Sequence, residues 1–312
     1  MRSLGINYDT GFLPGTDLSR KVFTEEAVRT DLTAIMERLH CQSVRVSGGH
    51  LDRIDVAARC AAELGLEVWY APFPVDLTPE ETLAVHADGA RRAQRLRETG
   101  AEVVYVAGCE ASLFGKGFVP GETWQDRIAA MGSADEAFWS GLGEILGRLN
   151  GFLAQVAATV RASFDGKLTY AAGPWEYIDW TPFDYVGSDG YRASYNAEKY
   201  PEEIRALTQH GKPVAITEFG TCAYRGAGEL GGMAWQPPEG AVPDEHEQVR
   251  YLTELLDVFD AEGVDTALWF TFASFNAVGA DDLRSYGVVR MLDDTNWEPK
   301  AVFHAMAERY AR

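Results

Sequence analysis

The stretch Pro213-Val214-Ala215-Ile216-Thr217-Glu218-Phe219-Gly220 leads a short apolar run into a single carboxylate. Such a run is typical of a buried strand, and the glycine after it lets the chain turn away. Glu218 therefore stands where a buried strand reaches a rim, which is a costly place for a charge without a partner or a function. On this stretch alone, a salt-bridged glutamate at a strand end explains the pattern equally well.

A second stretch resolves that ambiguity. Glu102-Val103-Val104-Tyr105-Val106-Ala107-Gly108-Cys109-Glu110 also rises through an apolar run and ends in a carboxylate. Two carboxylates at the ends of two separate strands are what the cleavage of a glycosidic bond requires. The two stretches together favour Glu110 and Glu218 as a catalytic pair.

Outward from these two stretches, strands and helices alternate along the whole chain. Helix starts are marked by Thr24 and by two capping-box sequences, Thr78-Pro79-Glu80-Glu81 and Ser133-Ala134-Asp135-Glu136. Trp297-Glu298-Pro299 is expected to open the last helix, and residues 111–132 are expected to form a loop. Strands are predicted over residues 4–9, 43–47, 67–73, 102–110, 167–173, 184–188, 213–219 and 266–272.

This order predicts an α/β protein, a single (β/α)8 TIM barrel over residues 1–312 with long loops after the fourth, seventh and eighth strands. A doubly wound open sheet is the structural alternative, but no GxGxxG motif follows the first strand. Active sites of barrels lie at the C-terminal ends of the strands. Glu110 and Glu218 belong to that face.

The overall charge narrows the range of partners. The 312 residues carry a formal net charge of -19 and no basic patch, so we expect neither a nucleic-acid nor a membrane partner. Met1-Arg2-Ser3 runs straight into the first predicted strand and leaves no apolar segment to cleave. We therefore expect a cytoplasmic protein, and the sequence does not predict its oligomeric state.

The cysteines do not indicate a metal centre. Cys41, Cys60, Cys109 and Cys222 are scattered without a CxxC pair, so neither a disulfide framework nor a zinc ribbon is predicted. Cys109 and Cys222 flank the two glutamates and can meet in space, but no suitably spaced histidine joins them. We predict no metal and no organic cofactor.

The chain resembles the retaining glycoside hydrolases built on (β/α)8 barrels, known as clan A. The resemblance rests on three segments: Ile216–Gly220, Phe183–Tyr191, and the ending Tyr286–Val289 with Trp297–Lys300. It implies that Glu110, ending the fourth strand, is the acid/base and that Glu218, ending the seventh, is the nucleophile. A retaining β-glycosidase acting on a β-glycoside or small oligosaccharide is the predicted function.

The resemblance also implies supporting roles for three residues. Arg45 would support the nucleophile, Tyr191 would hydrogen-bond beside it, and Trp269 would form the floor of the sugar subsite, next to a cis bond to Phe270. Each has a plainer alternative: Arg45 can pair with any buried acid, and Tyr191 and Trp269 can be packing residues.

Further candidates for substrate binding are Asn7, near the end of the first strand, and Trp175 and Glu176, after the fifth. Asn7 can equally anchor a loop, and Glu176 can equally form a salt bridge.

One residue departs from the clan pattern. The clan usually has asparagine before the acid/base, where it binds the sugar 2-hydroxyl, whereas this chain has Cys109. A thiol is too weak a hydrogen-bonding group to replace an amide. Either a neighbour such as Asn7 binds that hydroxyl, or the natural sugar lacks an ordinary 2-hydroxyl.

The same departure supports an alternative function, a non-catalytic barrel that binds a carbohydrate or a protein. Chains that begin like Gly5–Gly11 also resemble proteins described as abortive-infection proteins, but no residue here supplies a mechanism for phage defence.

Overall fold

A parallel barrel forms the centre of the protein, seen here in a computed structural model that describes residues 1–13 and 18–312. Its strands follow the order β5-β4-β3-β2-β1-β8-β7-β6, and an isolated parallel bridge between Ala172 and Ser188 joins the two outer strands. The predicted (β/α)8 barrel is therefore confirmed. The strands are β1 (Ser3–Asp9), β2 (Ser43–Gly48), β3 (Glu67–Pro72), β4 (Val103–Cys109), β5 (Lys167–Ala171), β6 (Val186–Asp189), β7 (Val214–Phe219) and β8 (Thr266–Trp269).

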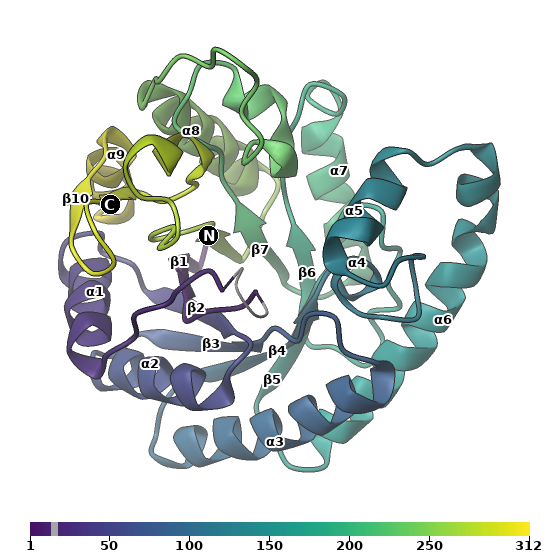
Figure 1. Cartoon of the computed structure of the whole chain (residues 1–312). Coiled ribbons are helices and arrows are strands. Elements are labelled where there is room, and N and C mark those ends of the chain that lie inside the picture. Colours follow the sequence, from purple (N-terminus) through teal and green to yellow (C-terminus); the bar gives the residue numbers. More distant parts are fainter. Residues whose placement is uncertain (14–17) are drawn as a thin grey trace.

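Helices surround this barrel as an outer ring (Figure 1). They are α1 (Glu25–Glu37), α2 (Leu51–Glu63), α3 (Pro79–Glu98), α6 (Glu136–Arg161), α7 (Tyr200–Leu207) with the 3-10 turn η2 (Thr208–His210), α8 (His246–Ala261) and α9 (Ala301–Tyr310). None of the helices that the structure describes is both long enough and apolar enough to cross a lipid bilayer.

The helix caps agree with the sequence in two cases and differ in one. Thr24 caps α1, and Thr78 with Glu81 forms the predicted capping box of α3. The third start lies two residues later than predicted. The Asp135 side chain accepts a hydrogen bond from the Phe138 amide and caps α6, whereas Ser133 ends the preceding helix.

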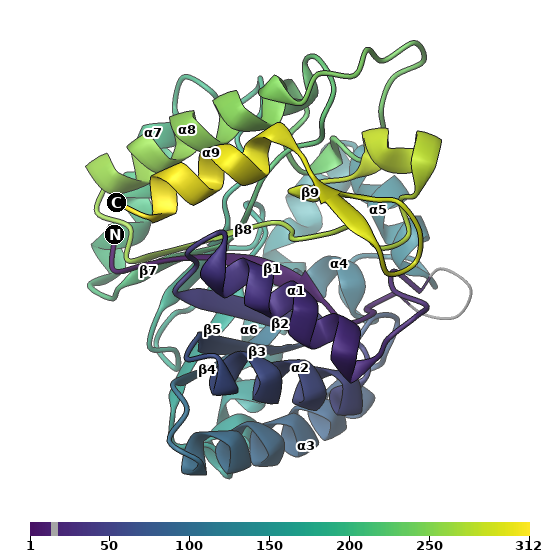
Figure 2. The same ribbon diagram turned by 90° about the vertical axis from the view of Figure 1, so that its left-hand side faces the viewer.

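The long connections gather at one end of the barrel (Figure 2). Residues 111–132 are not a plain loop as predicted, because they contain α4 (Ala111–Phe114) and α5 (Trp124–Gly132). The connection after β7 holds two 3-10 turns, η3 (Ala227–Glu229) and η4 (Gly231–Met233). After β8 come η5 (Gly279–Arg284) and the hairpin of β9 (Val289–Met291) with β10 (Trp297–Pro299).

The end of the chain differs from the prediction, and the barrel interior is filled. Trp297–Pro299 does not open the last helix but pairs as β10, and α9 begins at Ala301. Inside the barrel, Trp69, Tyr185 and Leu268 belong to one closely packed cluster. Because side chains fill the interior, any ligand must bind at the strand ends.

Candidate active site

The end of β4 carries an irregularity that sets the position of Glu110. Val104 and Val106 face the barrel interior, and the register of β4 against β5 then shifts between Val106 and Cys109. Gly108 sits within this shift at a φ of 102°, which glycine adopts without strain. The extra residue turns Cys109 inward and leaves Glu110 at the rim in a left-handed conformation, with φ 41° and ψ 48°. Such backbone is uncommon for glutamate and is often found at functional sites.

The turn after Glu110 is held from β5. The Ala111 amide donates to the Tyr170 hydroxyl (2.6 Å), and the Ser112 amide donates to Glu176 Oε1 (2.9 Å). The Tyr170 hydroxyl in turn donates to Glu176 Oε2 (2.8 Å). Glu176 is 6% exposed and uses both carboxylate oxygens in these bonds. It therefore anchors the turn that carries Glu110, in place of the substrate contact or salt bridge that the sequence suggested.

Trp175 belongs to the same anchor. Its indole nitrogen donates to the Ser112 hydroxyl at 3.0 Å. Trp175 is half-buried and is tied to α4 by its polar edge, and its contact with a substrate stays a prediction.

The carboxylate of Glu218 is held from two sides. Ile216 and Phe219 both pack in the layer between barrel and helices, and β7 shifts its register between these two residues. The shift leaves Glu218 at the barrel mouth. Arg45 Nη1 lies 2.7 Å from Glu218 Oε1, and the Tyr191 hydroxyl donates to Oε2 at 2.9 Å. Both oxygens of the expected nucleophile are thus occupied, and the residues that contact them are two of those named from the sequence.

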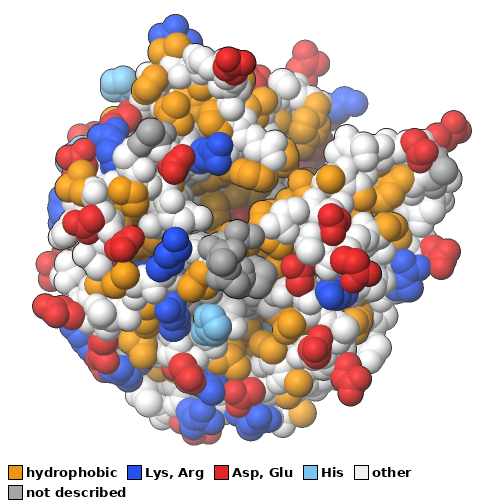
Figure 3. All heavy atoms as spheres, in the orientation of Figure 1, with side chains coloured by type: hydrophobic (Ala, Val, Ile, Leu, Met, Phe, Trp, Pro, Cys, Tyr) orange, Lys and Arg blue, Asp and Glu red, His pale blue; other side chains and the backbone are white. Residues whose placement is uncertain are grey.

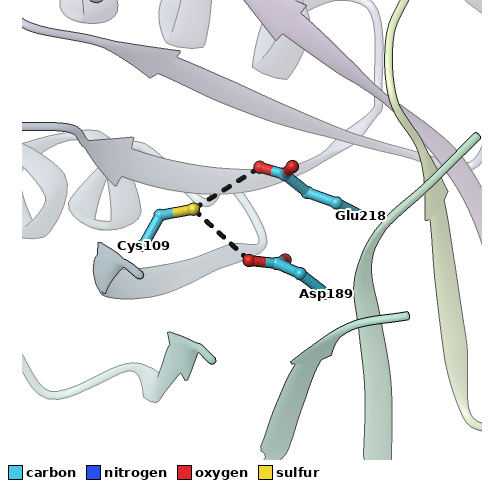
Figure 4. A group of neighbouring side chains, drawn as sticks. All are labelled: Cys109, Asp189 and Glu218. Atoms are coloured by element: carbon cyan, nitrogen blue, oxygen red, sulfur yellow. Dashed lines mark hydrogen bonds between the residues drawn. The ribbon is translucent and has the colours of Figure 1, made fainter. Parts of the chain in front are cut away.

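Asp189 is a third acid in the site, and the sequence analysis missed it. It ends β6 and accepts a hydrogen bond from the Thr217 hydroxyl at 2.8 Å. Figure 4 shows the Cys109 sulfur between two carboxylates, 3.4 Å from Asp189 Oδ2 and 3.5 Å from Glu218 Oε1. A carboxylate at the end of a strand was the signal that identified both glutamates, and it applies equally to Asp189.

This group of acids perturbs its own titration. Burial raises the pKa of Glu110 well above its usual range, and the charges of Asp189, Glu218 and Glu176 raise it further. Burial and Glu218 likewise raise the pKa of Asp189. The pKa of the Cys109 thiol is also raised well above its usual value, first by burial. At neutral pH Cys109 is therefore a neutral thiol with one proton to donate.

The donor set fits a metal ion poorly. One atom each from Cys109, Asp189 and Glu218 lies within 4.8 Å of the others, close enough for a shared cation. However, Arg45 already contacts the Glu218 oxygen that would act as ligand, and burial keeps the thiol protonated. A metal would have to displace both a guanidinium contact and a proton.

Cys222 does not take part in this site. It is fully buried in a separate cluster with Tyr224 and Tyr286, whereas Cys109 packs inside the barrel. The suggestion that Cys109 and Cys222 meet in space is therefore wrong.

Trp269 does not form the floor of the site. Because Leu268 faces the barrel interior, the next residue points outward to the helices. Trp269 is 0% exposed, packs edge-on against Phe219, and donates its indole N–H to the Tyr286 carbonyl. The plainer alternative, a core residue, is the correct one.

Phe270 occupies the position expected for Trp269. It lines a cavity at the barrel mouth together with Glu218. The non-proline cis bond also lies one residue later than predicted, between Phe270 and Thr271. The sequence analysis chose Trp269 of the Trp269-Phe270 pair. Because side chains alternate between the two faces of a strand and Leu268 faces inward, Phe270 is the residue on the inner face.

Asn7 joins three strands at the base of the site. Its amide nitrogen lies 3.0 Å from the Thr217 carbonyl and 3.3 Å from the carbonyls of Leu268 and Trp269. Asn7 therefore supports the backbone of the strand that carries Glu218, and it also lines the cavity beside that residue.

Aromatic rings follow one edge of the mouth. Phe12 stacks on Phe73 with centroids 5.2 Å apart, Phe114 meets Phe73 edge-on at 4.9 Å, and Trp124 follows Phe114 at 6.3 Å. Figure 3 shows the surface hollowed near the centre of this face, with hydrophobic side chains around the hollow. Flat apolar rings beside a polar floor suit a sugar, which has hydroxyl groups at its edges and C–H groups on its faces.

Comparison with known proteins supports the fold. No protein-family model matches the chain, and no curated protein matches its sequence. The structure is similar to a β-1,4-mannanase of glycoside hydrolase family 113, with a TM-score of 0.68, 16% identity and 99% of each chain covered.

Two other solved structures are similar as well. The β-glucuronidase from Ruminococcus gnavus gives a TM-score of 0.63 at 16% identity, with 100% of this chain and 50% of that chain covered. A fungal β-1,4-galactanase gives 0.58 at 13% identity, with 89% of this chain and 90% of that chain covered. The resemblance to clan A glycoside hydrolases is therefore confirmed for the fold.

Proposed function

We propose that the protein is a retaining β-glycosidase in which Glu110 is the acid/base and Glu218 the nucleophile. The observation that carries this proposal is the unequal environment of two glutamates at one barrel mouth. Glu218 receives hydrogen bonds from Arg45 and Tyr191, whereas Glu110 lies among like charges that raise its pKa. One carboxyl is thus equipped to attack and the other to hold a proton.

In the first step Glu110 donates its proton to the glycosidic oxygen, and a Glu218 oxygen bonds to the anomeric carbon as the leaving group departs. Arg45 and Tyr191 hold the attacking carboxylate in place by hydrogen bonds to its two oxygens while positive charge develops on the sugar. The product is a glycosyl ester on Glu218 and a deprotonated Glu110.

The second step reverses the role of Glu110. Once Glu218 is esterified its charge is gone, and one of the contributions that raise the pKa of Glu110 disappears with it. Glu110 can then remain ionised and accept a proton from water, whose oxygen bonds to the anomeric carbon as the ester bond to Glu218 breaks and frees its carboxylate. The electrostatic coupling between the two glutamates therefore serves both steps.

A panel of aryl β-glycosides tests this proposal, with mannosides, glucosides, galactosides and glucuronides assayed against wild type, Glu218→Gln and Glu110→Ala. Proton NMR of the first-formed product should show the β-anomer, as retention requires. Retention also predicts that the carboxyl groups of Glu110 and Glu218 lie about 5–5.5 Å apart. If wild type hydrolyses none of the panel yet binds one of its sugars, the non-catalytic carbohydrate-binding barrel becomes the better explanation.

A further inference from the structure

A cavity beside Glu218 contains two buried polar atoms without a hydrogen-bond partner among residues 1–13 and 18–312. They are Asn7 Oδ1 and Ser47 Oγ, and both residues line the cavity together with Phe12, Phe73 and Phe270. Asn7 is 2% exposed. Buried polar atoms in folded proteins are nearly always paired, so two unpaired atoms in one cavity beside a candidate nucleophile point to a ligand that pairs with them.

The orientation of the Asn7 amide is determined by its other contacts. One end of the amide faces the carbonyls of Thr217, Leu268 and Trp269, which only accept hydrogen bonds. That end must be the NH2 group, so the oxygen is the end that is left for the cavity. A ligand group that meets Asn7 must therefore donate a hydrogen bond.

Ser47 is placed to contact the same ligand. In the parallel register of β1 with β2, Asn7 pairs with Arg45 and Asp9 pairs with Ser47. Ser47 follows Arg45 by two residues and so lies on the same face, one layer nearer the barrel mouth. Its hydroxyl can both donate and accept, so it can complete the pairing of a ligand hydroxyl that donates to Asn7.

We propose that Asn7 Oδ1 and Ser47 Oγ form a subsite that binds one hydroxyl of the sugar attacked by Glu218. This inference rests on the proposed glycosidase function. The subsite selects glycosides with a free hydroxyl at that position, since an O-methyl, O-acetyl or fluoro group there has no hydrogen to donate to Asn7. Ser47 is the specificity residue best suited to mutation, because Asn7 also supports three backbone carbonyls.

Ser47→Ala tests the subsite on the best aryl glycoside of the panel and on its monodeoxy and mono-O-methyl analogues. We expect kcat/KM of the parent substrate to fall about 3- to 10-fold with no change in Tm, since the hydroxyl has no partner to lose. For the deoxy analogue that lacks the hydroxyl bound by this subsite, wild type and Ser47→Ala should have equal kcat/KM. Ser43→Ala is the matched control: Ser43 lies on the same strand and face but bonds to Ser3 at the far end of the barrel.

Binding separates this proposal from the proposed hydrolysis. The probes are 1-deoxynojirimycin and 1-deoxymannojirimycin, titrated calorimetrically into wild type, Ser47→Ala and Ser43→Ala. Weaker binding to Ser47→Ala alone, without hydrolysis of any glycoside, would support the subsite and overturn the glycosidase. If the protein hydrolyses glycosides but Ser47→Ala has the same kcat/KM as wild type on every substrate and analogue, the subsite is overturned and the glycosidase proposal stands. If no probe binds and no glycoside is hydrolysed, both the subsite and the glycosidase proposal are overturned.

Discussion

Replacing Glu176 by glutamine should impair catalysis although this side chain is buried behind the turn that carries Glu110. Its carboxylate accepts hydrogen bonds from the Ser112 amide, the Tyr170 hydroxyl and the Gly173 amide, at 2.9, 2.8 and 3.1 Å. Glutamine offers one oxygen, so at least one donor must face an NH2 group. Hydrogen bonds to a charged group contribute about 1.5–3 kcal/mol, so we expect the free energy of unfolding to fall by about 2 kcal/mol.

The substitution should also slow catalysis. A displacement of about 1 Å at a reacting group can cost about 100-fold in rate, so we expect kcat to fall at least 10-fold with KM little changed. The substitution also removes a charge that raises the pKa of Glu110, so the alkaline limb of the kcat/KM profile should move to lower pH. Urea denaturation and pH–rate profiles measure the two effects.

Two further variants separate position from charge. Tyr170→Phe loosens the same turn but keeps the Glu176 charge, so it should lower kcat with a smaller shift of the alkaline limb. Glu122→Gln is the control and should leave both quantities unchanged, because Glu122 lies on the same connection after β4 as the Glu110 turn but its side chain is 92% exposed. An unchanged kcat and an unchanged alkaline limb in Glu176→Gln would refute the positioning role.

Three further predictions concern the acids and the thiol. Glu218→Gln should abolish turnover without unfolding the protein. Glu110→Ala should still form the glycosyl-enzyme from an activated aryl glycoside, and added azide should release the sugar. If Glu110→Ala still hydrolyses substrates with poor leaving groups, Glu110 is not the acid/base. Burial and the Glu218 charge raise the pKa of Asp189 in the folded protein, so wild-type stability falls as pH rises from the ordinary aspartate range towards the raised pKa. Asp189→Asn should therefore be more stable than wild type at pH 8 but not at pH 4, in urea titrations at both pH values. Cys109→Asn should raise kcat/KM on 2-hydroxy aryl glycosides relative to their 2-deoxy analogues, and equal ratios in both proteins would show that another residue holds the 2-hydroxyl.

The fold could be predicted because its signals are local. Apolar runs and caps such as Thr24 and Thr78 are set by neighbouring residues, and they gave every strand of the barrel. The strand ends were harder, since one extra residue in β4 or β7 reverses which side chains face inward. Trp269 was misplaced for a related reason: its orientation follows from Leu268 facing the interior, which periodicity alone does not reveal.

The roles of Glu176 and Asp189 depend on contacts between distant segments. Nothing near Glu176 in the sequence indicates that the Ser112 amide will reach its carboxylate. Asp189 directly follows the strand predicted over residues 184–188, so the strand-end signal that identified both glutamates is present for it as well.

The asymmetry between two chemically identical side chains is what such a mechanism needs, and different parts of the fold supply it. Donors from β2 and from the segment after β6 converge on Glu218. Glu110 lies on a strained turn where Asp189, Glu218 and Glu176 add negative charge. An amide at position 109 would bring two more donors between these carboxylates, whereas the neutral thiol brings one weak donor and leaves their repulsion less screened. Under the proposed mechanism, a thiol at position 109 would therefore favour the protonated form of Glu110 more than an amide would, without any contact between the sulfur and the sugar.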